Sequence, residues 1–142
     1  MGPSAIREAG GRVTLSKILV QLDSIALDLE RRGPDGVDDL DHVATLDSLF
    51  TAALSWREPA AQAGGKFWNE HKFTDLTGQA RTSLHSARDA RSGRDEAATW
   101  RCLKDAAKDV YFVVDYLQGA TNTNRSRSNR VRASVEESDP EP

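Results

Sequence analysis

Residues 14–32 repeat apolar side chains every three or four positions along their whole length. The repeating positions are Leu15, Ile18, Leu22, Ile25 and Leu29. This period places them on one face of an α-helix, whereas the two-residue period of a strand would divide them between both faces. Thr14 can cap the start of the helix, and Gly33 followed by Pro34 can end it. The pattern predicts an amphipathic helix that needs other elements to cover its apolar face.

Three more segments show the helical period. The first, residues 38–57, precedes Pro59 and carries the apolar face Val43, Leu46, Leu49, Phe50, Ala53 and Leu54. The second, residues 74–92, carries the thinner face Leu76, Ala80, Leu84 and Ala87. The third, residues 95–117, precedes Gly119 and carries the face Trp100, Leu103, Ala107, Val110, Val114 and Leu117. Pro59 and Gly119 are expected to end their helices, because proline lacks an amide donor and glycine favours the left-handed conformation found after a helix.

The segments outside these helices have no clear period. We interpret residues 60–73 as a long connection that holds a short helix. We expect residues 1–13 to form a flexible or short helical segment ahead of the bundle. Residues 120–142 contain few large apolar side chains and a run of arginines followed by acidic residues, so we expect a disordered tail. The sequence therefore predicts an all-α protein, with an antiparallel bundle of four helices over residues 14–119, or five if the short helix is counted.

Composition excludes several classes of protein. A chain of 142 residues suits one domain, and no apolar run is long enough to span a membrane. The single cysteine, Cys102, excludes an internal disulfide and a thiolate-cluster metal site. The formal net charge of -3 gives no overall attraction to nucleic acid or anionic lipid. Because residues 1–11 lack a signal-type apolar stretch, we expect a cytoplasmic protein.

Two predicted helices carry apolar residues outside their main faces. In the last helix, Phe112 and Tyr116 point more than about 120° away from the main stripe. In the first helix, Val20 and Leu27 recur on a line well away from its main face. These second faces are either internal, because their helices lie centrally, or contacts for another protein or a second copy of the chain. We predict all four as partner-binding residues, with Phe112 and Tyr116 as the main anchors.

Charge is unevenly distributed along the chain. Residues 23–47 carry eight acidic side chains, and residues 66–94 carry six basic ones. One interpretation is a solvated basic face that pairs with the acidic part of the chain. The alternative is a nucleic-acid contact, in which arginines hold phosphates and an aromatic ring stacks on bases. The residues of that alternative are Arg81, Arg88, Arg91, Arg94 and Trp68.

Arg81 and His85 lie four positions apart, so their side chains can approach one another on a helix. The pair resembles the HEPN ribonucleases, a family of small helical bundles whose paired active sites use an arginine followed by a histidine. Here three residues intervene, one fewer than in the family pattern, and Thr82 follows the arginine. The resemblance implies a ribonuclease with Arg81 and His85 at its active site as a further alternative.

No other pattern indicates chemistry. Asp39 and His42 have the offset of two metal ligands on one helix face, but the sequence offers no matching pair on another helix. Helix capping by Asp38 and Asp39 is therefore the better interpretation. No histidine lies near Cys102 in sequence, and no glycine-rich phosphate loop occurs. We predict no catalytic residue, metal or cofactor, and a non-enzymatic helical interaction module that serves as an adaptor or as a small subunit of a larger assembly.

Overall fold

The computed structural model describes residues 13–35 and 41–137, with side chains placed as far as residue 122. Its elements are α2 (Leu15–Arg32), α3 (His42–Leu54), α4 (Arg57–Gly64), the 3-10 helix η3 (Gly65–Phe67), α5 (Glu70–Ser92) and α6 (Glu96–Glu137). The described residues contain no strand, which confirms the predicted all-α bundle with a short extra helix. None of these helices is both long and apolar enough to cross a membrane.

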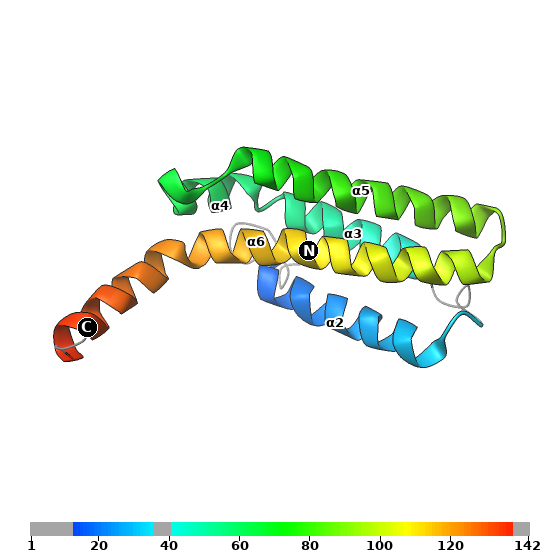
Figure 1. The fold of residues 1–142 in the computed structure, drawn as a ribbon, viewed down its shortest axis with the longest axis horizontal. Helices are drawn as coiled ribbons and strands as arrows, with labels where there is room; N and C mark the ends of the chain where they lie inside the picture. The colour runs from blue at the N-terminus through cyan, green and yellow to red at the C-terminus, as the bar shows by residue number, and fades with distance from the viewer. Residues whose placement is uncertain (1–12, 36–40, 138–142) are drawn as a thin grey trace, which may run out of the picture.

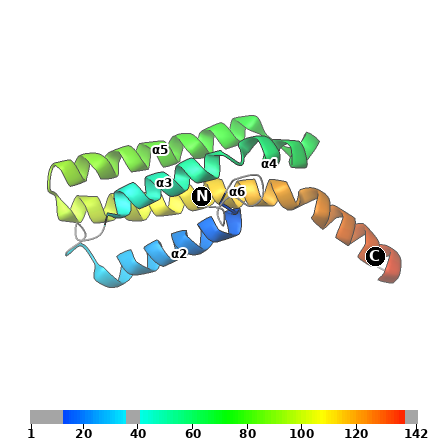
Figure 2. The same ribbon diagram turned by 180° about the vertical axis from the view of Figure 1, so that it is seen from behind.

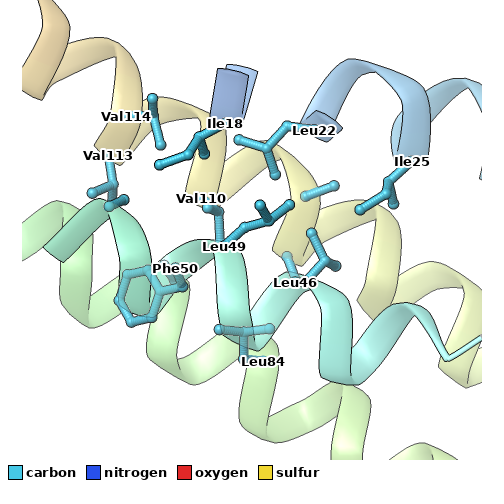
Figure 3. Packing of buried hydrophobic residues seen from close by; sticks show 14 of the residues in the cluster. Ile18, Leu22, Ile25, Leu46, Leu49, Phe50, Leu84, Val110, Val113 and Val114 are labelled. Carbon is cyan, nitrogen blue, oxygen red and sulfur yellow. The ribbon is translucent and has the colours of Figure 1, made fainter. Parts of the chain in front are cut away.

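α6 is the central helix of the bundle. Figures 1 and 2 show it running between α5 and α2, and it packs against α2, α3, α4 and α5. Its inward face consists of the buried residues Leu103, Ala106, Ala107, Val110, Val113, Val114 and Leu117. Figure 3 shows side chains of α2 and α3 meeting this face, with Leu84 of α5 below them. α6 is therefore central, as the internal interpretation of its second face requires, while the buried residues listed here belong to its main stripe.

α2 has the two ends that its sequence predicts. The Thr14 side chain accepts a hydrogen bond from the Lys17 backbone N–H at 3.2 Å. At the other end Gly33 adopts φ 68° and donates its N–H to the Leu29 carbonyl. All five predicted core residues of this helix are buried. Helix start, helix end and buried face therefore follow from local sequence alone.

Two tryptophans fasten α2 to the rest of the bundle. The indole Nε1 of Trp56, which follows α3, donates to the Val13 carbonyl at 2.7 Å. The indole Nε1 of Trp100, on α6, donates to the Leu29 carbonyl at 2.7 Å. The Lys104 ammonium lies 4.0 Å from the centre of the Trp100 ring. α2 is thus held near both ends by bonds to its main chain.

The second predicted helix, residues 38–57, is shorter than expected. α3 begins after Asp41, whose carboxylate accepts from the Ala44 N–H, while the predicted capping residues Asp38 and Asp39 lie outside the described residues. Pro59 ends no helix, because it lies in the first turn of α4, where an amide donor has no partner within the helix.

α4 packs closely on α6 through small residues. A Cβ atom added at Gly64 would lie 3.5 Å from the Cβ of Ala120 and 3.4 Å from that of Trp68. Ala60, one turn earlier, is fully buried. The predicted connection over residues 60–73 is therefore mostly ordered structure that covers one end of the bundle.

α5 begins at Glu70, earlier than the predicted residue 74. The Asn69 side chain caps it by accepting from the Lys72 N–H at 3.0 Å. Phe73 lies in the first turn and is buried, with its ring centre 5.1 Å from that of Trp68. Trp68 precedes the helix, so the periodicity within the helix did not reveal this contact.

α6 continues past the predicted end at Gly119 as far as Glu137. A glycine inside a helix costs about 1 kcal/mol, and here the buried residues Leu117 and Ala120 on either side of it hold the helix on the bundle. Beyond Ala120 the helical backbone leaves the bundle (Figures 1 and 2), and among the residues with placed side chains Ala120 is the one buried residue of the predicted tail, residues 120–142. Residues 1–12 and 138–142 lie outside the described residues.

Two backbone positions with left-handed φ should respond to substitution in opposite directions. Arg94 has φ 59°, where a residue with a Cβ is strained, so Arg94→Gly should raise the free energy of unfolding by about 0.5–1 kcal/mol. Gly33 has φ 68° and nothing within 4 Å of an added Cβ, so Gly33→Ala should lower it by about 1 kcal/mol through backbone strain alone. Urea unfolding measures both, and two changes of the same sign would contradict the assignment.

Candidate interaction site

The second side of α2 carries two exposed aliphatic residues. Val20 is 67% exposed and Leu27 is 56% exposed, and both point away from the core residues of the helix. Figure 1 shows α2 at the edge of the bundle, with α6 on one side and no described element on the other. Val13, which precedes α2, packs against the core. We call Val20 and Leu27 the α2 outer face.

α6 carries a second exposed pair. Phe112 is 44% exposed and Tyr111 is 37% exposed, with ring centres 6.5 Å apart in an edge-to-face arrangement. We call them the α6 aromatic pair. Phe112 was predicted from its direction on the helix. Tyr111 was not predicted, since its direction on the helix is close to the edge of the buried stripe.

Tyr116 has a role inside the molecule. Its hydroxyl accepts a hydrogen bond from the Asn69 backbone N–H at 2.8 Å, and its ring centre lies 5.2 Å from that of Trp68. The side chain is half-buried and ties α6 to the beginning of α5. We therefore leave Tyr116 out of the exposed surface, although it was predicted alongside Phe112.

Three of the predicted basic residues on α5 face α3. The Arg81 guanidinium lies 5.6 Å from the centre of the Phe50 ring. Arg88 pairs with Asp47 and Arg91 pairs with Asp41, each at 2.6 Å. The predicted pairing of this basic face with the acidic part of the chain is therefore present.

The remaining residues of the two alternative sites have separate neighbours. Trp68 is half-buried in its aromatic cluster, and its indole donates to Glu70 at 2.8 Å. Arg94 lies in the turn between α5 and α6. His85 is exposed and its imidazole lies 3.3 Å from the Asp89 carboxylate, whereas Arg81 contacts the ring of Phe50.

A charged cluster joins the end of α2 to the beginning of α3. His42 Nε2 lies 2.9 Å from the Asp28 carboxylate, which also accepts from Arg32 Nε at 2.9 Å. Hydrogen bonds from His42 and then Arg32 lower the pKa of Asp28 below its ordinary value. The Ala44 N–H and then Arg91 lower the pKa of Asp41. Among the described residues no group of histidine, cysteine and carboxylate side chains could hold a metal ion.

Comparison with known proteins assigns no family. No protein-family model matches the chain, and neither a curated protein nor a solved structure matches it.

The Asp28 cluster should make stability depend on acid. A carboxyl whose pKa is depressed in the folded state stabilises that state at neutral pH, and the contribution disappears as pH falls from about 5 through the folded pKa. Asp28→Asn should therefore flatten the decline of the unfolding free energy below about pH 5, measured by urea titration. Asp23→Asn is the control, because the Asp23 carboxylate makes no hydrogen bond or ion pair within the described residues. Equal slopes in Asp28→Asn and the unmodified protein would contradict this assignment.

Proposed function

We propose that this protein is a non-enzymatic helical interaction module, an adaptor or a small subunit of a larger assembly. The observation that carries the proposal is the α2 outer face, where Val20 and Leu27 stand in solvent on the side opposite the core. Single exposed aliphatic residues are common on protein surfaces. Here two such residues lie on one line of α2, a helix at the edge of the bundle, and the α6 aromatic pair is exposed as well. Together these residues favour a contact surface.

The fold supports this function by keeping the α2 outer face in a fixed position. The bonds from Trp56 and Trp100 fix α2 near both ends, so little conformational entropy is lost there when a partner binds. Full burial of an exposed valine or leucine contributes about 1.5–3 kcal/mol. A few such side chains suit a contact that forms and dissociates, with another protein or with a second copy of the chain.

The two alternative functions receive less support from the geometry. A nucleic-acid contact along α5 needs Arg81 and a ring of Trp68 available to the nucleic acid, yet the Arg81 guanidinium lies over the Phe50 ring and Trp68 is half-buried in its own aromatic cluster. A HEPN-like ribonuclease needs Arg81 and His85 to act on one phosphate, and these side chains have different neighbours here. The interaction surface needs no rearrangement of the described residues.

The proposal predicts that charge on the α2 outer face abolishes association without loss of folding. Proteins that associate with the unmodified chain can be identified by cross-linking in its native host. We expect the double variant Val20→Asp, Leu27→Asp to lose these cross-linked partners. It should also lose any concentration-dependent increase in mass seen by light scattering. The melting temperature should stay within a few degrees, because both side chains are exposed.

A matched control adds the same charge elsewhere on α2. Gln21 and Ala26 are exposed and point about 100° to either side of the α2 outer face. Gln21→Asp with Ala26→Asp should retain the association. If the Val20 and Leu27 variant keeps every cross-linked partner and the same mass, the α2 outer face is not the contact surface.

A further inference from the structure

An open groove lies between the beginning of α3 and the end of α5. It has a volume of about 570 Å³, and its lining includes Val43 and Asp47 from α3 and Arg88, Arg91, Ser92 and Arg94 from α5 and the turn after it. Figure 2 shows the turn between α5 and α6 at the same end of the bundle as the beginning of α3. Three guanidinium groups from a short stretch of chain therefore border one hollow.

The groove is locally basic although the chain as a whole is acidic. Its lining contains three arginines and one carboxylate, and Asp41 pairs with Arg91 from outside the lining, so this cluster carries a net charge of +1, against -3 for the whole protein. Val43 supplies an apolar part of the lining beside the three arginines. The groove therefore suits an anionic ligand.

Two of the arginines are held in place without being saturated. Arg88 Nη2 lies 2.6 Å from Asp47, and Arg91 Nη1 lies 2.6 Å from Asp41. A guanidinium has five N–H donors, so each retains donors for a ligand after this contact. The pairs are partly exposed, and exposed ion pairs are weak enough to share an arginine with a ligand.

The third arginine has no such partner. The Arg94 side chain is exposed and makes no ion pair or side-chain hydrogen bond within residues 13–35 and 41–122. It belongs to the lining of the groove, on the turn that follows α5. Its guanidinium keeps all five donors available for a ligand that Arg88 and Arg91 also reach.

We propose that this groove binds a small ligand that carries a phosphate group, through Arg88, Arg91 and Arg94. The planar guanidinium fork matches the oxygens of phosphate and can bond two of them at once. Carboxylates limit the size of the ligand, because Asp95 and Glu96 line the adjoining hollow beside Arg91 and Arg94. They would repel the continuing backbone of a nucleic acid, so the site fits a compact phosphate compound.

The test measures the binding of inorganic pyrophosphate to the full chain by isothermal titration calorimetry at constant ionic strength. We expect saturable binding, weakened about tenfold or more by Arg94→Gly and by Arg88→Gln. Arg94→Gly is informative because it relaxes a left-handed residue, so a loss of binding cannot result from unfolding. Arg101→Gln removes one positive charge from an exposed position on α6 outside the groove lining, and it should leave binding unchanged.

Three outcomes would overturn the proposal. The first is the absence of saturable pyrophosphate binding to the unmodified chain. The second is an equal loss of affinity in Arg101→Gln and Arg88→Gln, which would indicate overall charge rather than a site. The third is a single-stranded oligonucleotide that binds more tightly than pyrophosphate and depends on the same arginines, which would assign the groove to extended nucleic acid.

Discussion

The bundle depends on the burial of one face of α6. This face meets α2, α3, α4 and α5, and its central residues Val110, Val113 and Val114 are fully buried. The four other helices are placed mainly by their contacts with α6. A helix that directs its whole apolar stripe to one side leaves its other side to solvent, and there Phe112 fills no gap in the core. The exposed surface is thus a product of the same arrangement that builds the core.

Local signals in the sequence predicted the fold class and one helix completely. For α2, the apolar period, the Thr14 cap and Gly33 all lie within a few residues of one another, and all agree. The boundaries elsewhere failed because the signal was ambiguous. Proline can follow one helix or occupy the first turn of the next, and Pro59 does the second. The sequence around Gly119 did not indicate that α6 continues, because the continuation depends on the buried residues beside it, which contact α4 and the core.

Helical periodicity predicted exposed residues only where the direction of a side chain on its helix determines its exposure. Val20 and Leu27 point away from their own stripe and no described element covers them, so periodicity was sufficient. Tyr116 has a similar direction, but its hydroxyl meets Asn69, which lies 47 positions earlier in the chain. Periodicity carries no information on a contact of that separation. The sequence did not predict that the arginines border one groove, because the α3 side of the groove, which includes Asp47, is distant in sequence from these arginines.

The attachment of α2 has a consequence for how this surface can evolve. Both indole donors bond main-chain carbonyls, at Val13 and Leu29, and every amino acid carries such a carbonyl. Replacement of outward side chains on α2 therefore leaves these two anchors intact. Mutations can accumulate on the solvent side while the inward stripe and the two anchors stay constant. Descendants of one ancestral chain could in this way acquire different recognition properties on an unchanged scaffold.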